Sequence, residues 1–417
     1  MEKVKAILII HPMVSPMASH LSWSTSGYKT IAFYLPTNEL VEYITKGVAA
    51  TNFDVKITAT EDFEQDLKLI REHQAQYDIV YGYIGAESAI PYGEKLLRKL
   101  FPQQSNDPAT SGWRFSKYEM NERLMECGLP YIKQCRIVEK QITPAIEKFL
   151  QEVPYPLVVK PSFNSAASEG VYFCNTAAEV YACINNISEK GYFGRVSEII
   201  IQEKVIGAEY LVDSFSYAAE HKMSTAFSYE KYVIKNTPVY TALNQVDNND
   251  VIIRQLFAVV KKILTALGVE FGFAHTEIMV TPDNEIKLIE LNLRPSGLAG
   301  AINEVAYAAT RIDQYTLAAA ALAKKELVSE NDNKKHSLFF INNVGFTYKR
   351  LKVELINSLS SYQDIKVFKP TCDKIPEKHS LAESVALVHL ANATAAGLQA
   401  DKDILKNYEE VGTLFEQ

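Results

Sequence analysis

The sequence has few of the residues and motifs that would assign it to a class at once. Only five of its 417 residues are cysteines, and these are odd in number and show no CxxC spacing. This pattern argues against a disulfide framework and a zinc site, and it predicts reduced thiols in a cytoplasmic protein. A GxxxxGK phosphate loop is missing, and Gly82-Tyr-Ile-Gly85 lacks the GxGxxG spacing of a dinucleotide fold.

Positive charge and long apolar runs are also scarce. The chain has 43 Lys and Arg against 50 Asp and Glu, a net charge of −7, so we expect no nucleic-acid partner. The first apolar run, residues 4–10, is too short to span a membrane and ends without a signal-peptide cleavage pattern. We therefore expect no membrane association, and we interpret this run as a first β-strand.

The length predicts two or three domains. Residues 1–112 alternate between strand and helix patterns, which predicts an N-terminal α/β domain with a small parallel sheet. The expected strands are 4–10, 53–59 and 77–84, and the expected helices are 38–50, 61–75 and 91–101. Residues 101–113, rich in Pro, Gln, Ser and Asn, have the composition of a linker.

Residues 113–330 are expected to form a second domain, with subdomains of about 113–205 and 206–330. Its first helix begins with a Ser116–Glu119 capping box and ends at Gly128, and a later amphipathic helix runs from Asp250 to Gly268. Further helices are expected at 144–151, 177–187 and 305–325, and strands at 131–138, 156–161, 170–174, 198–205 and within 209–234. The polar run 329–335 marks a boundary before a small α+β domain, residues 336–417, which has no recognisable chemistry.

The segment 275–294 carries the most chemical information. It has the pattern of two strands joined at Pro282-Asp-Asn284. With a loop of two or four residues, the numbers of paired positions sum to 567, and Glu277 lies directly opposite Glu290. Period-2 alternation then places His275, Glu277, Glu290, Asn292 and Arg294 on one face, and a second set on a core face. That second set is Ile278, Val280, Ile289, Leu291 and Leu293.

Two carboxylates that face each other repel unless a cation lies between them. Glu277, Glu290 and Asn292 form the all-oxygen set that Mg²⁺ takes, with phosphate oxygens completing its shell. The alternative is a solvated polar face, which a three-residue loop would favour because it would turn Glu277 away from Glu290.

Two lysines precede features that suit phosphate binding. Lys160 ends a buried strand and is followed by a loop of small residues that includes Ser165 and Ser168, whose N–H and hydroxyl groups can fold over phosphates. The alternative for Lys160 is a plain hairpin with a snorkelling side chain. Lys117 lies in the first turn of a helix, where the helix dipole disfavours a cation. We therefore expect Lys117 to have an anionic partner.

A further segment can form a hinge between subdomains. Residues 199–213 contain an apolar strand, then Gln202-Glu203-Lys204-Val205, Gly207 and Glu209. The backbone of Lys204 and Val205 could meet an adenine edge, and Glu203 or Glu209 could bind the adenine amino group or ribose hydroxyls. An exposed hairpin end is the alternative.

The ordered set of these segments resembles the ATP-grasp superfamily, and within it the carboxylate–amine, amino-acid ligase-like branch. The resemblance covers roughly residues 1–325 and is most specific at Glu290-Leu-Asn-Leu-Arg294-Pro-Ser-Gly297. It implies an ATP-grasp fold of α/β and α+β class with a preceding N-terminal α/β domain. The loop at 162–169 departs from the family, because it has Ser and Ala where relatives often have several glycines.

The resemblance implies a role for each predicted site residue. Lys117 and Lys160 would hold ATP phosphates; Glu277, Glu290 and Asn292 would hold one or two Mg²⁺, for which Mn²⁺ could substitute; and Arg294 would clamp the carboxylate. The enzyme would convert a carboxylate to an acyl phosphate, release ADP, and transfer the acyl group to an amine. Beside the metal face, His275 could orient a ligand or assist deprotonation of the amine, and a residue that only packs in the sheet is the alternative. Lys231, Lys235 and Arg311 are considered for carboxylate recognition.

Three alternatives stay open. The acceptor could be the thiol of an acyl carrier protein, the protein could bind ATP for regulation without turnover, or the polar face could simply be solvated. The expected partners are small-molecule carboxylates and amines, with a homodimer as a further expectation. Residues 11–28, with His20, Trp23 and Tyr28, are expected to form a loop at the carboxyl end of a strand that lines the substrate site.

Overall fold

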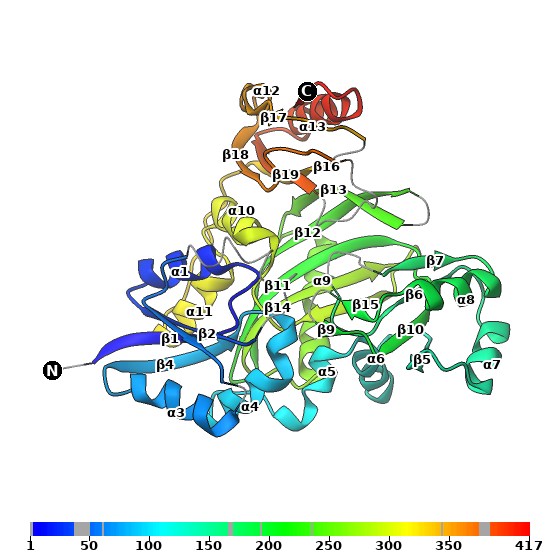
Figure 1. Ribbon diagram of the computed structural model, residues 1–417. Helices are drawn as coiled ribbons and strands as arrows, with labels where there is room; N and C mark the ends of the chain where they lie inside the picture. Colours follow the sequence, from blue (N-terminus) through cyan, green and yellow to red (C-terminus); the bar gives the residue numbers. More distant parts are fainter. Residues whose placement is uncertain are drawn as a thin grey trace.

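The structure, a computed structural model, describes residues 3–36, 51–60, 62–165, 170–191, 194–234, 237–342, 345–374 and 384–417. The helix expected at 38–50 lies outside these ranges, as do Ser168 and Lys235. The described chain folds around three main sheets, two of which face each other near the middle of the molecule (Figure 1). Helices and strands are both abundant, as the sequence predicts for a mixed α/β and α+β protein.

The N-terminal sheet is parallel, as the alternating pattern predicts. Its strand order is β3-β2-β1-β4, and its carboxyl edge faces the rest of the protein. Its elements are β1 (Val4–Ile10), α1 (Pro16–Thr25), β2 (Lys29–Tyr34), β3 (Val55–Thr58), α3 (Phe63–His73), β4 (Tyr77–Ile84), η1 (Glu87–Ala89) and α4 (Ile90–Leu100). Buried Ile, Leu and Phe side chains from the strands form its core.

The loop predicted for residues 11–28 is wrong in part, because it contains the helix α1. This helix has no continuous apolar stripe: only Ala18, Ser19 and Trp23 are buried, so its sequence lacks the periodic signal of a surface helix. The helix does follow the carboxyl end of β1, as expected. Trp23 is fully buried and packs against Tyr83 and Tyr315.

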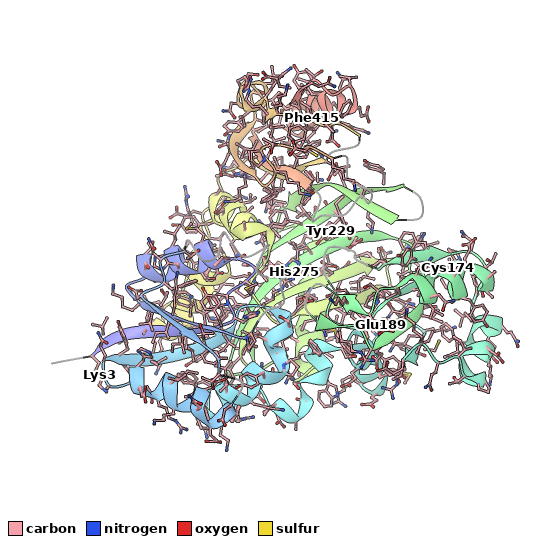
Figure 2. All side chains as sticks on the ribbon, viewed as in Figure 1. Lys3, Cys174, Glu189, Tyr229, His275 and Phe415 are labelled. Carbon is pink, nitrogen blue, oxygen red and sulfur yellow. The ribbon has the colours of Figure 1, made fainter. Side chains whose placement is uncertain are left out.

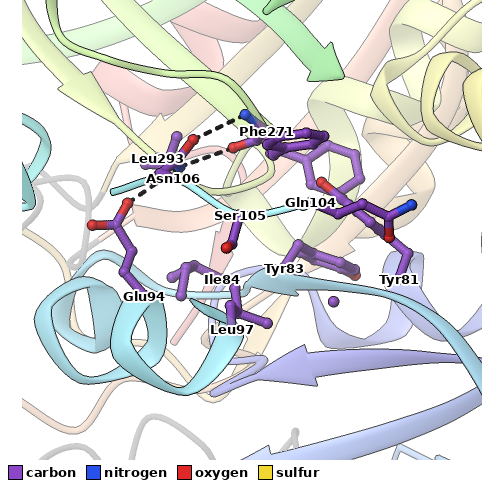
Figure 3. A pocket seen from close by; sticks show the side chains of 13 residues that line it. Tyr81, Tyr83, Ile84, Glu94, Leu97, Gln104, Ser105, Asn106, Phe271 and Leu293 are labelled. Carbon is purple, nitrogen blue, oxygen red and sulfur yellow. Dashed lines mark hydrogen bonds between the residues drawn. The ribbon is translucent and has the colours of Figure 1, made fainter. Parts of the chain in front are cut away.

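The predicted linker is folded and attaches the N-terminal domain to the large sheet. It contains η2 (Pro108–Thr110) and α5 (Gly112–Phe115). Arg114 is fully buried and forms a two-bond ion pair with Glu94 of α4, at 2.8 Å for both N–O contacts. Asn106 donates to Glu94 and to the Phe271 carbonyl oxygen, beside a cavity of about 20 Å³ (Figure 3). The linker thereby connects α4 to the segment that leads into β14 (Gly272–Val280), a strand of the large sheet.

A small antiparallel sheet forms one side of the central cavity. Its strand order is β5-β10-β6-β7, and it is covered by helices that pack on its apolar face. The elements of this part are α6 (Lys117–Glu126), β5 (Gln134–Val138), α7 (Pro144–Glu152), β6 (Leu157–Pro161), β7 (Tyr172–Cys174), α8 (Ala177–Asn186), β8 (Lys190–Gly191), β9 (Gly194–Arg195) and β10 (Glu198–Glu203). Ser116 caps α6 by accepting from Glu119 N at 3.3 Å, and Gly128 follows the helix with φ of 68°.

An eight-stranded sheet forms the other side, in the order β15-β14-β11-β12-β13-β16-β19-β18. Its strands are β11 (Ala208–Tyr217), β12 (Glu220–Ile234), β13 (Thr237–Val246), β14 (Gly272–Val280), β15 (Ile286–Asn292), β16 (Lys335–Asn342), β18 (Tyr362–Val367) and β19 (Ser384–Asn392). The strands of residues 336–417 thus extend the same sheet as the strands before residue 330. The domain bounds given above stay a prediction.

The remaining elements cover this sheet. They are α9 (Val251–Ala266), η3 (Leu298–Gly300), α10 (Ala301–Thr310), α11 (Gln314–Ala323), β17 (Arg350–Leu351), α12 (Val353–Asn357), α13 (Ala395–Glu410) and β20 (Phe415–Glu416). Gly268, with φ of 65°, follows α9 as the amphipathic pattern predicts. Within the described ranges, no helix has the length and apolar character needed to cross a membrane.

Candidate active site

Most of the predicted site residues that the structure describes meet in one cavity between the small sheet and the large sheet. The cavity has a volume of about 500 Å³, within the range of small-molecule sites. Figure 2 places Tyr229, which lines it, near the centre of the molecule. Twelve of the predicted residues line the cavity: Lys117, Lys160, Ser165, Gln202, Glu203, Lys204, Val205, Glu209, Glu277, Glu290, Asn292 and Arg294.

The strand pairing places Glu277 directly opposite Glu290, and His275 opposite Asn292. This part of the register prediction is confirmed, but the reason given for it is wrong. The loop between β14 and β15 comprises residues 281–285, an odd number that by itself would shift the pairing by one residue. A β-bulge between Glu277 and Ile278 restores the predicted register.

The bulge also explains where the core prediction fails. Ile278, Val280, Leu291 and Leu293 are buried as expected. Ile289 is the extra residue of the bulge, and it lines the cavity instead of the core. A bulge changes the face to which a side chain points. The apolar side chain of Ile289 therefore lines the cavity beside the acidic residues.

Acid and amide side chains gather in one part of the cavity wall. The carboxylates of Glu87, Glu277 and Glu290 line the cavity together with the Asn292 amide. With its nitrogen turned toward the acids, the Asn292 amide donates to Glu290 Oε1 at 3.0 Å. Carboxylate and amide oxygens are the ligands that a hard divalent cation takes, so the residue types present fit such an ion. In the described part of the chain, no three His, Cys, Asp or Glu side chains suffice to hold a metal, so an ion here would need further oxygen ligands.

Both predicted lysines are buried in the cavity wall. Lys117 lies 3.0 Å from Glu290 Oε1, so it has the anionic partner that its place in a first helical turn favours. Burial alone would lower the pKa of Lys117, but Glu290 and Glu87 raise it above its ordinary value. Burial, and next the charge of Lys117, lower the pKa of Lys160 to about 8. The backbone joins the two elements, because Lys117 N donates to the Ser162 carbonyl oxygen at 3.0 Å.

Arg294 follows β15 and points to the same cavity. Its NH2 group lies 3.6 Å from Glu87 Oε2, and NH1 donates to the Pro295 carbonyl oxygen. Its buried Nε atom has no hydrogen-bond partner among the described residues. A buried guanidinium donor without a partner is costly, and an anionic ligand such as a carboxylate or phosphate would supply one.

Glu87 is a cavity residue that the sequence reasoning missed. It comes from η1, just after the carboxyl end of β4, and contributes a third carboxylate beside Glu290. Burial and the nearby Glu290 charge raise its pKa, against the effect of Arg294. Its position was a usable signal, because ligands of open α/β sheets bind outside the carboxyl ends of the strands.

His275 does not line the cavity; it lies behind the acid cluster. Its Nδ1 is 3.1 Å from the fully buried Asp213 and 3.2 Å from Ser296 Oγ, and its Nε2 is 3.6 Å from Glu277. Burial alone would lower the pKa of His275, but the hydrogen bonds to Asp213 and Glu277 raise it to about 8. The imidazole therefore holds Glu277 from the side away from the cavity. A direct contact of His275 with a substrate stays a prediction.

The hinge segment forms the opposite end of the cavity. Lys287 lies 2.9 Å from Glu203, whose carboxylate also accepts from Lys133 N. The Lys204 ammonium lies 4.0 Å from the centre of the Phe173 ring. The cavity lining also includes an apolar set that the sequence reasoning did not assign to the site: Ile132, Val158, Val171, Phe173, Met279 and Ile289. Val158 and Phe173 pair with each other, and Val158 also pairs with Gln202 beside the hinge.

The residues considered for carboxylate recognition are separated in the structure. Lys231 lines the cavity and forms an ion pair with Glu209. Arg311 ends α10 in a left-handed conformation, with its guanidinium 5.5 Å from the Tyr307 ring, and is not among the cavity residues. Trp23 is likewise outside the described lining, so the expectation that its loop lines the site has no support from that residue.

Comparison with known proteins identifies the fold. Residues 153–303 match the sequence model of the ATP-grasp domain. A comparison with curated protein sequences finds no significant match. An L-amino acid ligase from Bacillus licheniformis is similar in structure, with a TM-score of 0.75, 17% identity and 98% of both chains covered.

Two further solved structures are similar over the whole chain. N5-carboxyaminoimidazole synthetase from Staphylococcus aureus, complexed with ADP, has a TM-score of 0.67, 14% identity and 98% of both chains covered. N5-carboxyaminoimidazole synthase from Aspergillus clavatus, in complex with ADP and 5-aminoimidazole ribonucleotide, has a TM-score of 0.70, 12% identity, and 98% of this chain and 99% of that chain covered. The protein therefore has the ATP-grasp fold, with the predicted parallel N-terminal sheet before it.

Proposed function

From this fold and cavity, we propose that the protein is an ATP-dependent ligase. It activates a carboxylate, most simply that of an amino acid, as an acyl phosphate, joins the acyl group to an amine, and releases ADP and phosphate. The observation that supports this most is the meeting of Lys117, Lys160 and Arg294 with the oxygen cluster of Glu277, Glu290 and Asn292 in one cavity. A solvated polar face would not bury these charges together.

The nucleotide would lie along the apolar end of the cavity. Phe173 and its apolar neighbours would contact adenine, Glu203 and the Lys204–Val205 backbone would meet its edge, and Glu209 would accept from ribose hydroxyls. Lys160 and Ser165 would then face the phosphates from the small sheet, and Lys117 from the first turn of α6. The strand pairing supports this direction, because Val158 pairs with Gln202 and Phe173 near the hinge, whereas Lys160 lies further along β6, opposite Ile200.

Carboxylate activation needs positioning and charge neutralisation more than proton transfer. Glu277, Glu290 and Asn292 would hold one or two Mg²⁺ ions, which when bound offset the charge of the phosphates. Arg294 would orient the substrate carboxylate, whose oxygen attacks the γ-phosphorus while the bond to the ADP oxygen breaks. The amine then attacks the acyl carbon and phosphate leaves. Arg294 and Lys117 would offset charge on the phosphoryl group in transit.

The test is ADP release from Mg-ATP in the presence of pooled amino acids and small carboxylates, with hydroxylamine as a trap. Acid-dependent ADP with a matching hydroxamate would establish carboxylate activation and identify the acid, and Mn²⁺ replacing Mg²⁺ would test the cation. Clear Mg-ATP binding without turnover from any pool would instead favour a carrier-protein thiol acceptor or a regulatory binder. Absence of nucleotide binding would overturn the proposal.

A further inference from the structure

The strand pair β12–β13 separates the cavity from the C-terminal helix α13. Tyr229, Lys231 and Tyr240 lie on the face of this strand pair that lines the cavity. Glu230 lies between Tyr229 and Lys231, so strand alternation turns it to the other face. Ala242, its partner across the strands, packs in the core of residues 336–417, which includes Leu405 of α13.

On that outer face, one lysine of α13 bridges both strands. Lys402 Nζ donates to Glu230 Oε1 of β12 at 2.6 Å and to Asn244 Oδ1 of β13 at 3.1 Å. Asn244 Nδ2 also donates to Glu230 Oε1, at 2.9 Å. The Lys402 side chain is only 5% exposed, so its ammonium depends on these two acceptors.

The bridge lies where the strand pairing is irregular. Glu230 pairs with Ala242, but the next residue, Lys231, pairs with Tyr240, which leaves Thr241 as an extra residue in a β-bulge. A bulge interrupts the ladder of backbone hydrogen bonds and bends the strand. Thr241 Oγ1 donates to the Glu230 carbonyl oxygen at 3.1 Å. Side-chain contacts therefore replace part of the backbone pairing beside Lys231.

Both cavity residues that flank Glu230 contact acids of the site. Tyr229 Oη donates to Glu277 Oε1 at 3.3 Å, and Lys231 forms the ion pair with Glu209. Glu277 belongs to the oxygen cluster, and Glu209 lies on the adjacent strand β11, where it pairs with Met279. A shift of β12 at Glu230 would therefore move two neighbouring contacts in the cavity wall.

We propose that Lys402 is a positioning residue of the active site: by bridging Glu230 and Asn244 at the bulge, it holds Tyr229 and Lys231 against Glu277 and Glu209. The C-terminal segment then serves as a brace for the cavity. The expected kinetic effect rests on the proposed ligase function, whereas the bracing of β12 and β13 does not.

The experiment compares three variants of the full-length protein. Lys402→Met removes the ammonium and keeps the aliphatic stem, Lys402→Arg keeps a donor, and Lys406→Met changes an exposed lysine of the same helix as a control. We expect Lys402→Met to lower kcat/KM for ATP by about tenfold, the low end for losing a group that orients site ligands. It should also speed amide hydrogen exchange in residues 226–246, whereas Lys402→Arg and Lys406→Met should stay close to wild type.

A further variant, Glu230→Gln, tests the same bridge from β12. It replaces Lys402→Met in the experiment if Lys402→Met does not fold. Because both residues act through one contact, the double variant should lose no more activity than either single one. Equal kinetics and exchange in Lys402→Met and Lys406→Met would overturn the proposal, as would faster exchange spread over the whole chain. If the wild-type protein releases no ADP, the ligase proposal fails. If Lys402→Met then still shows faster exchange confined to residues 226–246, the proposal that Lys402 braces β12 and β13 is retained.

Discussion

The two sheets that enclose the cavity contribute different parts of the predicted ATP site. The small sheet supplies a cation, Lys160, and apolar side chains such as Val158 and Phe173. The large sheet supplies Glu277, Glu290 and Asn292 from one hairpin. An ATP molecule needs both: an apolar surface and cations for base and phosphates, and oxygen ligands for the accompanying metal.

The two buried lysines differ in pKa because their surroundings differ. Lys117 crosses to the large sheet and pairs with Glu290, which helps to raise its pKa above the ordinary value. Lys160 stays on the small-sheet side, where burial and Lys117 lower its pKa to about 8. Lys160 is thus the lysine whose charge is less compensated within the protein, and it has more to gain from a bound phosphate.

The largest expected effect comes from breaking the acidic wall. Glu290→Gln should lower kcat with Mg-ATP by about a thousandfold or more, because it removes charge from the oxygen cluster that faces the phosphates. Steady-state ADP release measures this, and circular dichroism checks the fold. Glu285→Gln, at an exposed position of the same hairpin, is the matched control and should retain activity. Retained turnover in Glu290→Gln would remove the metal assignment.

A smaller loss is expected from the cationic side of the opposite wall. Lys160→Met should lower kcat/KM for ATP by about a hundredfold, because a charge-assisted phosphate contact is lost while the apolar stem is kept. Kinetics at varied ATP concentration measure the effect, with Lys148→Met, an exposed lysine on α7, as the control. A wild-type value for Lys160→Met would place the phosphates elsewhere.

The apolar part of that wall should affect binding more than chemistry. Phe173→Ala removes a ring that lines the cavity and contacts Lys204, so we expect the KM for ATP to rise by roughly tenfold, in line with the burial of one aromatic side chain. The value of kcat should change little. The control is Tyr181→Ala, an exposed aromatic on α8. A loss of kcat with an unchanged KM would argue that the base does not lie at this end.

The smallest effect is expected where the two walls touch at the hinge. Lys287 of β15 and Glu203 of β10 form an ion pair whose side chains are 15% and 23% exposed. Such a partly hydrated pair contributes at most about 1 kcal/mol, so Lys287→Met should change the KM for ATP by less than about fivefold. Nucleotide titration measures this. A tenfold change would instead show that the pair sets the position of Glu203.

Local patterns predicted the fold class and much of the candidate site. The cap at Ser116 and the end at Gly268 depend on contacts within one element or turn, so the sequence carries their signals. The parallel N-terminal sheet joins distant strands, but the alternation of strand and helix along the chain predicts it. The opposition of Glu277 and Glu290 was also predicted, but the loop length assumed for it was wrong. A bulge depends on how two whole strands fit their neighbours, which alternation along one strand does not reveal.

The features that were missed depend on contacts between distant segments. Glu87 joins the site through the packing of the N-terminal sheet against the large sheet, and Trp23 is buried between Tyr83 of β4 and Tyr315 of α11. The helix α1 gave no periodic signal, since its neighbours and not its own stripe decide its burial. The functional roles of the cavity residues stay predictions.

The buried Glu94–Arg114 pair has a practical consequence for making chimeras. Its partners come from α4, from the linker at Asn106 and from the carbonyl oxygens of Leu267 and Gly268. A chimera that exchanged only residues 1–100 for those of a relative would leave Arg114 buried without its carboxylate unless the incoming helix also carried an acid at position 94. A cut placed after Arg114 would move Glu94, Asn106 and Arg114 together, and the remaining contacts would persist because Leu267 and Gly268 contribute only backbone carbonyl oxygens.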